Sequence, residues 1–402
     1  MRKALVATVI ALIICSNLVL TRGQEQVDTR LTAASSKFSF KLYNEILKQR
    51  TRGNTFVSPA SVMLALAMTY NGAAGTTRQA MAQTLDIEGM SLDEVNRAFA
   101  DLKSALTPND PHIQVKIANS LWARNGFALD PAFIARNKQH YGAEITSLDF
   151  SNPAAPDTIN AWVNKNTDGK IQKIVERIND DDVLFLINAI YFKGQWQFPF
   201  RKENTRPDMF RLAGGQQKQV QMMSQSGSYF YYKGRGFQAV ALPYGSGGRV
   251  SMYVFLPDEQ TGLEQFEKDL TPENWDGWMK SFGIRPGDVK LPRFKIEWES
   301  KLNDMLKALG MAEAFDPLRA NFSPIAKPNS ANQIYLSEVR HKSWCEVNEE
   351  GTVAAAATSV VGTLTSIQPE RFWMKVDRPF FFAIRDNPTG VVLFMGSVTN
   401  PG

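Results

Sequence analysis

The sequence predicts an α+β fold in one large domain, because helical patterns dominate the first part of the chain and strand patterns the later part. Phe38, Leu42 and Ile46 recur every four residues, as on the buried face of a helix. Further along, Val183–Ile187 is an uninterrupted apolar run, which is typical of a strand buried on both faces. No linker, low-complexity run or repeat divides the 402 residues.

Other segments also have helical or strand patterns. Val62–Tyr70 predicts a second apolar helix. Val250–Leu256 predicts a second apolar strand, and the turn-rich segment 244–248 precedes it. Ile334–Val347 alternates in the manner of a further strand. Its two faces carry Val339, His341, Ser343, Cys345 and Val347 on one side, and Arg340, Lys342, Trp344 and Glu346 on the other.

The N-terminus has the basic and apolar regions of a signal peptide. Arg2 and Lys3 precede the apolar run Ala4–Ile14, which is shorter than the roughly 20 residues that a membrane span needs. We therefore expect residues 1–23 to be a cleaved signal peptide and residues 24–402 to form a secreted domain, or a periplasmic one in a bacterium. The alternative is that the apolar run forms a buried N-terminal helix.

Charge and cysteine content exclude several kinds of partner and bond. From residue 24 onward there are 42 basic and 40 acidic residues, a net charge of +2, which offers no field for nucleic acid. Beyond the predicted signal peptide Cys345 is the sole cysteine, so we expect no internal disulfide.

Enzyme and metal-site motifs are missing from the sequence. None of the three histidines, His112, His140 and His341, accompanies the nucleophile elbow of a Ser–His hydrolase. No His-Glu-x-x-His motif or paired-cysteine spacing indicates a metal. Gly234–Ala239 fits a dinucleotide-binding pattern, but the segment Val240–Pro243 that follows predicts a strand rather than a phosphate-binding helix. We therefore interpret Gly234–Ala239 as a turn.

Residues 352–368 are unusual because none of them is charged. So long a connection without structure is uncommon unless it is functional or disordered, and its β-branched residues argue against disorder. A short Ala-based helix, weakened by Val360, Val361 and Gly362, and an ordinary buried strand are the alternatives. Alternate residues are all small or medium-sized, so the segment could be an exposed loop or a central strand: Thr352, Ala354, Ala356, Thr358, Val360 and Gly362.

Several blocks of sequence, in order from about residue 30 to the C-terminus, resemble those of the serpin family. One departure is Val353 in the hinge block, where the family commonly has Glu and where the side chain should face outward. The matching blocks are Asn54–Ser61, Asn188–Gly194, Leu291–Phe294, Glu349–Thr358, Asp377–Ile384 and Leu393–Gly396.

The resemblance implies a protease inhibitor, not an enzyme, built from several helices packed around three β-sheets, with an exposed reactive loop at about residues 350–371. In the family's mechanism a serine protease cleaves this loop and forms an acyl-enzyme, and the freed loop inserts into the main sheet and traps the protease. The alternative is a non-inhibitory serpin that acts as a carrier, chaperone or storage protein. Such members usually have bulky, charged or proline residues in the hinge, which this hinge lacks.

The family's usual spacing from the hinge glycine, Gly351, places the reactive bond at Thr365–Ser366, with Leu364–Thr365 as the second choice. Thr365 suits elastase-like or subtilisin-like pockets, whereas Leu364 would suit a chymotrypsin-like enzyme. Specificity then also depends on the residues before the bond, which are Gly362, Thr363 and Leu364.

The resemblance also assigns residues to the opening of the sheet. Trp196, Arg293 and Glu349 fall where the loop first enters, and we expect Arg293 and Glu349 to form a surface ion pair worth at most ~1 kcal/mol. The hinge is assigned to Glu349, Glu350, Gly351, Thr352, Val353, Ala354, Ala355, Ala356, Ala357 and Thr358, and the shutter to Ser58, Ser61, Asn188 and His341.

The expected partner is a target serine protease, held as a covalent acyl complex by a monomer with no cofactor, metal, nucleic acid or membrane. Glycosaminoglycan activation is not expected. Members that use it carry a basic stripe on the helix that corresponds to Leu92–Leu106, and this segment mixes Arg97 and Lys103 with Asp93, Glu94 and Asp101.

Overall fold

The computed structural model describes residues 27–49, 53–107, 109–326, 333–351 and 370–402, and it confirms the α+β class. The described helices are α2 (Thr29–Gln49), α3 (Pro59–Tyr70), α4 (Gly75–Thr84), α5 (Leu92–Leu106), α6 (Pro131–Tyr141), α7 (Ala155–Asn166), α8 (Gly262–Lys268), α9 (Pro272–Ser281) and α10 (Asn303–Leu306).

The described strands fall into two sheets. A five-stranded sheet has the order β10 (Phe294–Lys301), β11 (Leu336–Val347), β4 (Leu184–Gly194), β2 (Ile113–Arg124) and β3 (Glu144–Leu148). A nine-stranded sheet has the order β1 (Thr55–Val57), β14 (Val392–Val398), β13 (Phe380–Asp386), β8 (Val250–Pro257), β7 (Phe237–Tyr244), β6 (Gln217–Gly234), β9 (Gly283–Pro292) and β12 (Phe372–Lys375), with β5 (Arg206–Arg211) paired to β6.

The expectation of three sheets differs from these two because of β6. This strand is 18 residues long. Its first residues pair with β5 and its last residues pair with β7, so that one continuous strand joins two groups of strands that would otherwise be separate sheets. The helices lie around these sheets as the sequence predicts.

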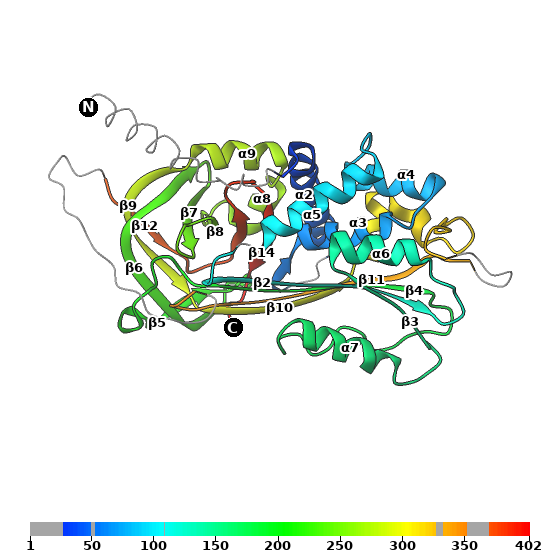
Figure 1. The fold of residues 1–402 in the computed structure, drawn as a ribbon. Coiled ribbons are helices and arrows are strands. Elements are labelled where there is room, and N and C mark those ends of the chain that lie inside the picture. Colours follow the sequence, from blue (N-terminus) through cyan, green and yellow to red (C-terminus); the bar gives the residue numbers. More distant parts are fainter. Residues whose placement is uncertain (1–26, 50–52, 108, 327–332, 352–369) are drawn as a thin grey trace, which may run out of the picture.

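The five-stranded sheet is covered on both faces (Figure 1). Helices α3, α5 and α6 lie on one side, and α7 lies on the other. All twelve residues of α3 are buried, because this helix is packed between the two sheets. Ser58 caps its N-terminus by accepting a hydrogen bond from the Ser61 amide, and Pro59 supplies the fixed φ that suits a first helical residue.

The C-terminal strands complete the main core. Phe56 on β1 stacks on Phe382 of β13 and on Phe394 of β14, with ring centroids 5.5 and 5.0 Å apart. Gly396 lets β14 approach β1, since a Cβ there would lie 2.1 Å from the carbonyl oxygen of Thr55. The last part of the chain is therefore an integral part of the domain.

The helices and strands that the sequence predicts are confirmed. Helical patterns become α2 and α3, and the apolar runs become β4 and β8. The alternating segment becomes β11, and the candidate dinucleotide motif Gly234–Ala239 runs from the last residue of β6 through a turn into β7. These agreements follow from strong apolar periodicity, which local sequence carries by itself.

Candidate functional site

The candidate site is the seam between β4 and β11, two parallel strands in the middle of the five-stranded sheet. They pair from Leu184 opposite Leu336 to Tyr191 opposite Trp344. Beyond that rung β4 continues to Gly194 and β11 to Val347 without pairing to each other. The two strands therefore separate at one end of the seam, and the predicted hinge begins at that end.

A polar cluster occupies the middle of the seam on its core side. His341 of β11 lies opposite Asn188 of β4, and their side chains are 2.5 Å apart from Nδ1 to Oδ1. The Ser58 amide donates to His341 Nε2 at 3.2 Å, so Nε2 accepts and Nδ1 carries the proton. Asn188 Nδ2 donates to the Ser61 hydroxyl at 2.6 Å. The four predicted shutter residues thus form one hydrogen-bonded group across β4, β11 and the start of α3.

Sequence reasoning missed two further buried polar residues beside this cluster, Asn119 and Ser343. Asn188 Nδ2 also donates to Asn119 Oδ1 at 2.5 Å, and Asn119 is its register partner on β2. Ser343 on β11 donates to the carbonyl oxygen of Phe56 at 2.6 Å. Asn119 is a polar residue in a largely apolar strand, and this pattern could have indicated a buried hydrogen bond. Its partner could not be predicted, because that depends on the order of the strands in the sheet. Each of these six buried side chains has a hydrogen-bond partner, which matters because leaving a buried polar group unsatisfied costs about 1–3 kcal/mol.

Burial lowers the pKa of His341 to about 3, and its hydrogen bond to Asn188 offsets only part of this effect. A protonated ring would place a proton on Nε2, where the Ser58 amide already donates. The neutral tautomer is therefore part of the closed seam.

At the separated end of the seam Arg293 and Glu349 form the expected ion pair. Arg293 Nε lies 2.8 Å and Nη2 2.5 Å from Glu349 Oε1, which also accepts from the Thr205 hydroxyl. The expectation of a surface pair is wrong, because Glu349 is only 2% exposed. Burial alone would raise the pKa of Glu349, but the hydrogen bonds from Arg293 and Thr205 leave it below its ordinary value.

Trp196 lies at the same end, directly after β4. Its Nε1 donates to the Asn348 carbonyl at 2.9 Å, and its ring stacks on Tyr244 with centroids 4.3 Å apart. Gly351 forms a bridge to Gln195 with φ of 114°. A Cβ at Gly351 would lie 2.2 Å from the Gly194 carbonyl oxygen, so this position requires glycine for both its backbone angle and its close contact.

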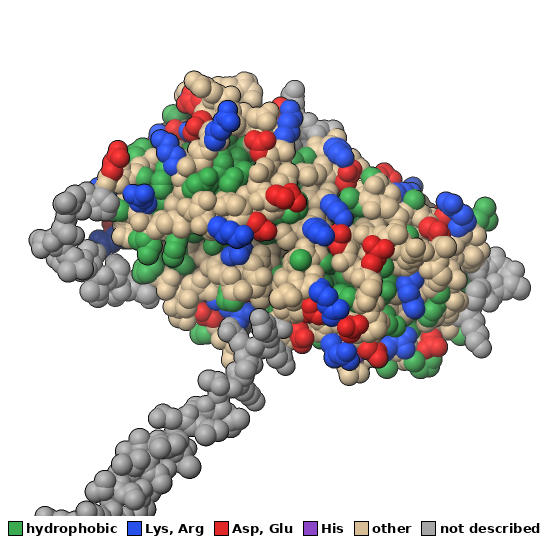
Figure 2. All heavy atoms as spheres, turned by 90° about the horizontal axis from the view of Figure 1, so that it is seen from above, with side chains coloured by type: hydrophobic (Ala, Val, Ile, Leu, Met, Phe, Trp, Pro, Cys, Tyr) green, Lys and Arg blue, Asp and Glu red, His purple; other side chains and the backbone are tan. Residues whose placement is uncertain are grey.

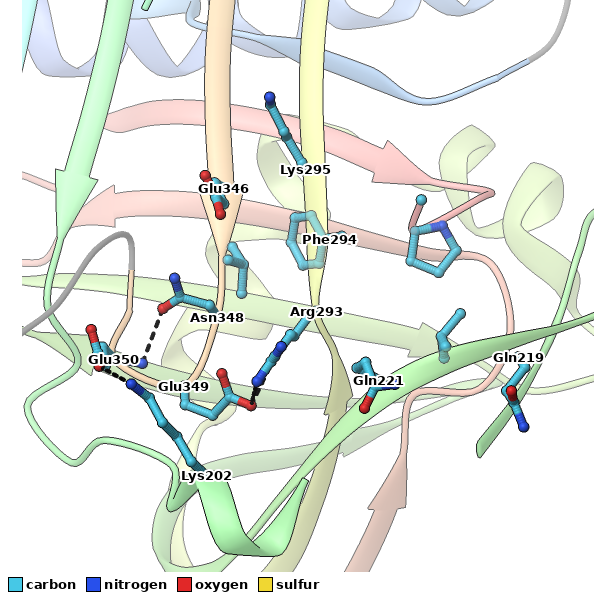
Figure 3. A pocket seen from close by; sticks show the side chains of 14 residues that line it. Lys202, Gln219, Gln221, Arg293, Phe294, Lys295, Glu346, Asn348, Glu349 and Glu350 are labelled. Atoms are coloured by element: carbon cyan, nitrogen blue, oxygen red, sulfur yellow. Dashed lines mark hydrogen bonds and ion pairs between the residues drawn. The ribbon is translucent and has the colours of Figure 1, made fainter. Parts of the chain in front are cut away.

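Figure 3 shows the cavity at this end, with Arg293 directed at Glu349 and Lys202 directed at Glu350. The cavity has a volume of about 550 Å³ and is lined by the ends of β10 and β11 and by the C-terminal Pro401 and Gly402. Lys202 Nζ is 2.5 Å from Glu350 Oε1. The root of the predicted loop is thus held by two ion pairs at the mouth of the seam.

Several predicted site residues lie outside the described residues. These are the hinge residues Thr352, Val353, Ala354, Ala355, Ala356, Ala357 and Thr358, the specificity residues Gly362, Thr363 and Leu364, and the reactive bond Thr365–Ser366. Within the described parts of the chain, no group of His, Cys, Asp or Glu side chains is suited to hold a metal ion. Among the same residues, no helix is both long and apolar enough to cross a membrane.

Comparisons with known proteins agree on one family. The profile described as "Serpin (serine protease inhibitor)" matches residues 33–401. "Leukocyte elastase inhibitor A" of Rattus norvegicus is 36% identical over 384 residues, which are 92% of this chain and 100% of the relative. The native state of tengpin, a thermophilic serpin, has a TM-score of 0.86 at 33% identity, over 94% of this chain and 95% of tengpin. The structure of human thyroxine-binding globulin complexed with thyroxine has a TM-score of 0.83 at 27% identity, over 92% of this chain and 98% of that chain.

The closed seam should weaken in mild acid because of His341. Its pKa is about 3 in the fold and 6.5 ordinarily, so the unfolded chain binds a proton that the folded chain excludes. Stability from this group is fully present above pH 6.5 and is lost as the pH falls toward 3. Between pH 7 and pH 5 the loss should be about 2 kcal/mol in the free energy of unfolding by urea.

His341→Gln should flatten this pH dependence between pH 7 and pH 5, whatever its effect on stability at pH 7. His140→Gln, at a partly buried position on α6, is the control and should keep the slope of the natural protein. An unchanged slope in His341→Gln would show that other groups cause the acid sensitivity.

Proposed function

The chain belongs to the serpin family and is a protease inhibitor rather than an enzyme; we propose that it traps serine proteases by inserting its cleaved reactive loop between β4 and β11. The observation that carries this proposal is the seam, whose two parallel strands separate beyond Tyr191 and Trp344, with the loop root at Gly351 anchored in the mouth.

The length of the seam supports this proposal. β11 has 12 residues, and the uncharged segment after Gly351 is long enough to supply a strand of similar length. Each residue that gains strand hydrogen bonds contributes about 1 kcal/mol net. The small alternate side chains of the new strand would fit between the sheet and the core when the strand lies between β4 and β11. A strand added to a sheet in this way is a known form of β-augmentation.

The proposed reactive bond is Thr365–Ser366, with Leu364–Thr365 second. A small β-branched Thr365 supports elastase-like or subtilisin-like targets, and the relatives named for inhibition of leukocyte elastase are consistent with the first class. A carrier function is the second candidate, since human thyroxine-binding globulin shares the fold. The hinge sequence favours inhibition, because none of its residues between Gly351 and Thr358 is bulky, charged or proline.

The proposal includes export of a monomer after removal of residues 1–23. The basic residues Arg2 and Lys3 and the apolar run that follows them support it. Residues 24–402 would then act as a single domain in the extracellular space or a periplasm, with no cofactor.

We expect an SDS-resistant complex between this protein and an elastase-like or subtilisin-like protease. The peptide released with the complex should begin at Ser366, as mass spectrometry would show, or at Thr365 if a chymotrypsin-like enzyme is the target. A mixed protease panel provides the test. Cleavage of the loop by every protease without any covalent complex would contradict trapping.

Arg placed on the inward face of the hinge should convert the inhibitor into a substrate. In Thr352→Arg or Ala356→Arg, an unpaired charge would enter the sheet interior at a cost of several kcal/mol. Each ~1.4 kcal/mol added to the insertion barrier slows insertion about tenfold, so ~3 kcal/mol would slow it more than a hundredfold and deacylation would come first. The measurement is the number of inhibitor molecules consumed per protease inactivated.

Val353→Arg and Ala355→Arg are the matched controls, because alternate residues of a strand face the opposite side. They should trap protease nearly as well as the natural protein. Equal trapping by all four variants would mean that insertion of this strand is not the mechanism.

Heparin should accelerate inhibition less than tenfold at physiological salt. On α5 Arg97 and Lys103 alternate with acidic residues, and Lys103 is partly buried. Figure 2 shows basic and acidic side chains interspersed over the face seen from above, without a broad basic surface. Progress curves with and without heparin provide the measurement, and a tenfold or larger increase would contradict the expectation.

A further inference from the structure

The last rung of the seam is an aromatic pair on the face that α7 covers. Tyr191 of β4 and Trp344 of β11 are register partners, and their ring centroids are 5.4 Å apart at 58°. The Lys170 ammonium lies 4.8 Å from the Trp344 centroid and 6.0 Å from that of Tyr191. One cation therefore contacts rings on both sides of the seam, within the distance at which ring and cation attract.

A second lysine contacts the same indole without spanning the seam. Lys295 Nζ is 5.6 Å from the Trp344 centroid, but Lys295 belongs to β10, which pairs with β11 on the side away from β4. Lys170 and Lys295 are both exposed. The structure thus contains two similar contacts, of which only the one from Lys170 joins β11 to β4.

Trp344 also ties β11 to the layer beneath α7. Trp344 is 4% exposed and Tyr191 is 3% exposed, although this face carries polar residues elsewhere on β11. Among the described residues, Trp344 is the one side chain that β11 contributes to the buried cluster around α7, which also contains Tyr191, Ile159 and Val163. Moving β11 away from β4 therefore removes Trp344 from this cluster as well.

We propose that Tyr191, Trp344 and Lys170 form a clasp, defined by these three residues, that holds the seam closed and limits the rate at which a strand can enter it. This proposal rests on the proposed function, because it assigns residues that control loop insertion. The clasp occupies the last paired rung before the strands separate, so an entering strand reaches it before the polar cluster at His341 and Asn188.

Strand geometry explains why an entering strand must break the clasp. Paired strands lie about 4.8 Å apart, so a strand inserted between β4 and β11 brings their separation to about 10 Å. The Tyr191 and Trp344 rings then lose contact, and Lys170 cannot remain within about 6 Å of both. The contact of Lys295 with Trp344 is unaffected, because β10 and β11 move together. Loss of the Lys170 contact should therefore favour opening, whereas loss of the Lys295 contact should not.

The test compares Lys170→Met with Lys295→Met, which remove the charge and keep an unbranched side chain of similar reach. Hydrogen exchange of the uncut protein reports opening without any protease. Seam amides in residues 184–191 and 336–344 should exchange about fivefold faster in Lys170→Met. At 1.36 kcal/mol per tenfold change, this corresponds to a free energy of seam opening that is lower by ~1 kcal/mol. The exchange rates of the seam amides should be unchanged in Lys295→Met. The exchange rates of amides in the β7–β8 pair should be unchanged in both variants.

Equal exchange at the seam in the two variants would overturn the clasp. In Trp344→Phe, which keeps a ring at this rung, the seam amides should exchange at a rate between those of the natural protein and Trp344→Ala. A folded Trp344→Ala variant whose seam amides exchange as slowly as in the natural protein would also overturn the clasp. With a protease that forms the covalent complex, Lys170→Met should raise the rate of trapping about fivefold.

The two proposals fail separately. Faster seam exchange in Lys170→Met without any covalent complex would support the clasp and reject trapping. A covalent complex that forms at the same rate in Lys170→Met and Lys295→Met, with equal seam exchange, would support trapping and reject the clasp.

Discussion

The parallel pairing of β4 with β11 is the constraint on which the rest of this structure depends. Each strand is also held by an antiparallel neighbour, β2 on one side and β10 on the other. Parallel pairing is slightly less stable per residue than antiparallel pairing, so the joint between these strands is the natural place for the sheet to part. β4 is buried along almost its whole length, whereas β11 carries the charged residues Arg340, Lys342 and Glu346 on one face.

Three kinds of interaction hold β4 and β11 together, in the plane of the sheet and on each of its two faces. Backbone hydrogen bonds run along the paired rungs, the His341–Asn188 cluster holds the core side, and the Tyr191–Trp344 pair holds the side beneath α7. Burying a polar group is favourable only while its hydrogen-bond partners are in place. The cluster therefore favours the observed pairing of β4 with β11 over arrangements in which these hydrogen bonds are broken. The aromatic pair adds contact area at the rung where backbone pairing ends.

The mouth of the seam is organised differently, by charge. Glu349 is buried against Arg293 and Thr205, and Glu350 pairs with Lys202, so the loop root has a defined position although the cavity beside it is open. A buried carboxylate that lost Arg293 would cost far more than a surface pair contributes. These two ion pairs therefore fix the position of the loop root as far as Gly351.

By itself the sequence determined the fold class and the kind of its most strongly patterned helices and strands. Helical periodicity and uninterrupted apolar runs were sufficient for α2, α3, β4 and β8, and the family resemblance pointed to His341, Asn188, Arg293 and Glu349 before any geometry was known. Tertiary structure alone decided which strands are neighbours and which side chains meet.

Asn119, Thr205 and Lys170 belong to the site because strand order, register and loop packing bring them to Asn188, Glu349 and Trp344. The same holds for Glu349, whose charge the sequence predicted to be at the surface and the fold buries. The physical reason is that periodicity reports which face of an element is covered, whereas the identity of the covering residue depends on contacts between segments far apart in the chain.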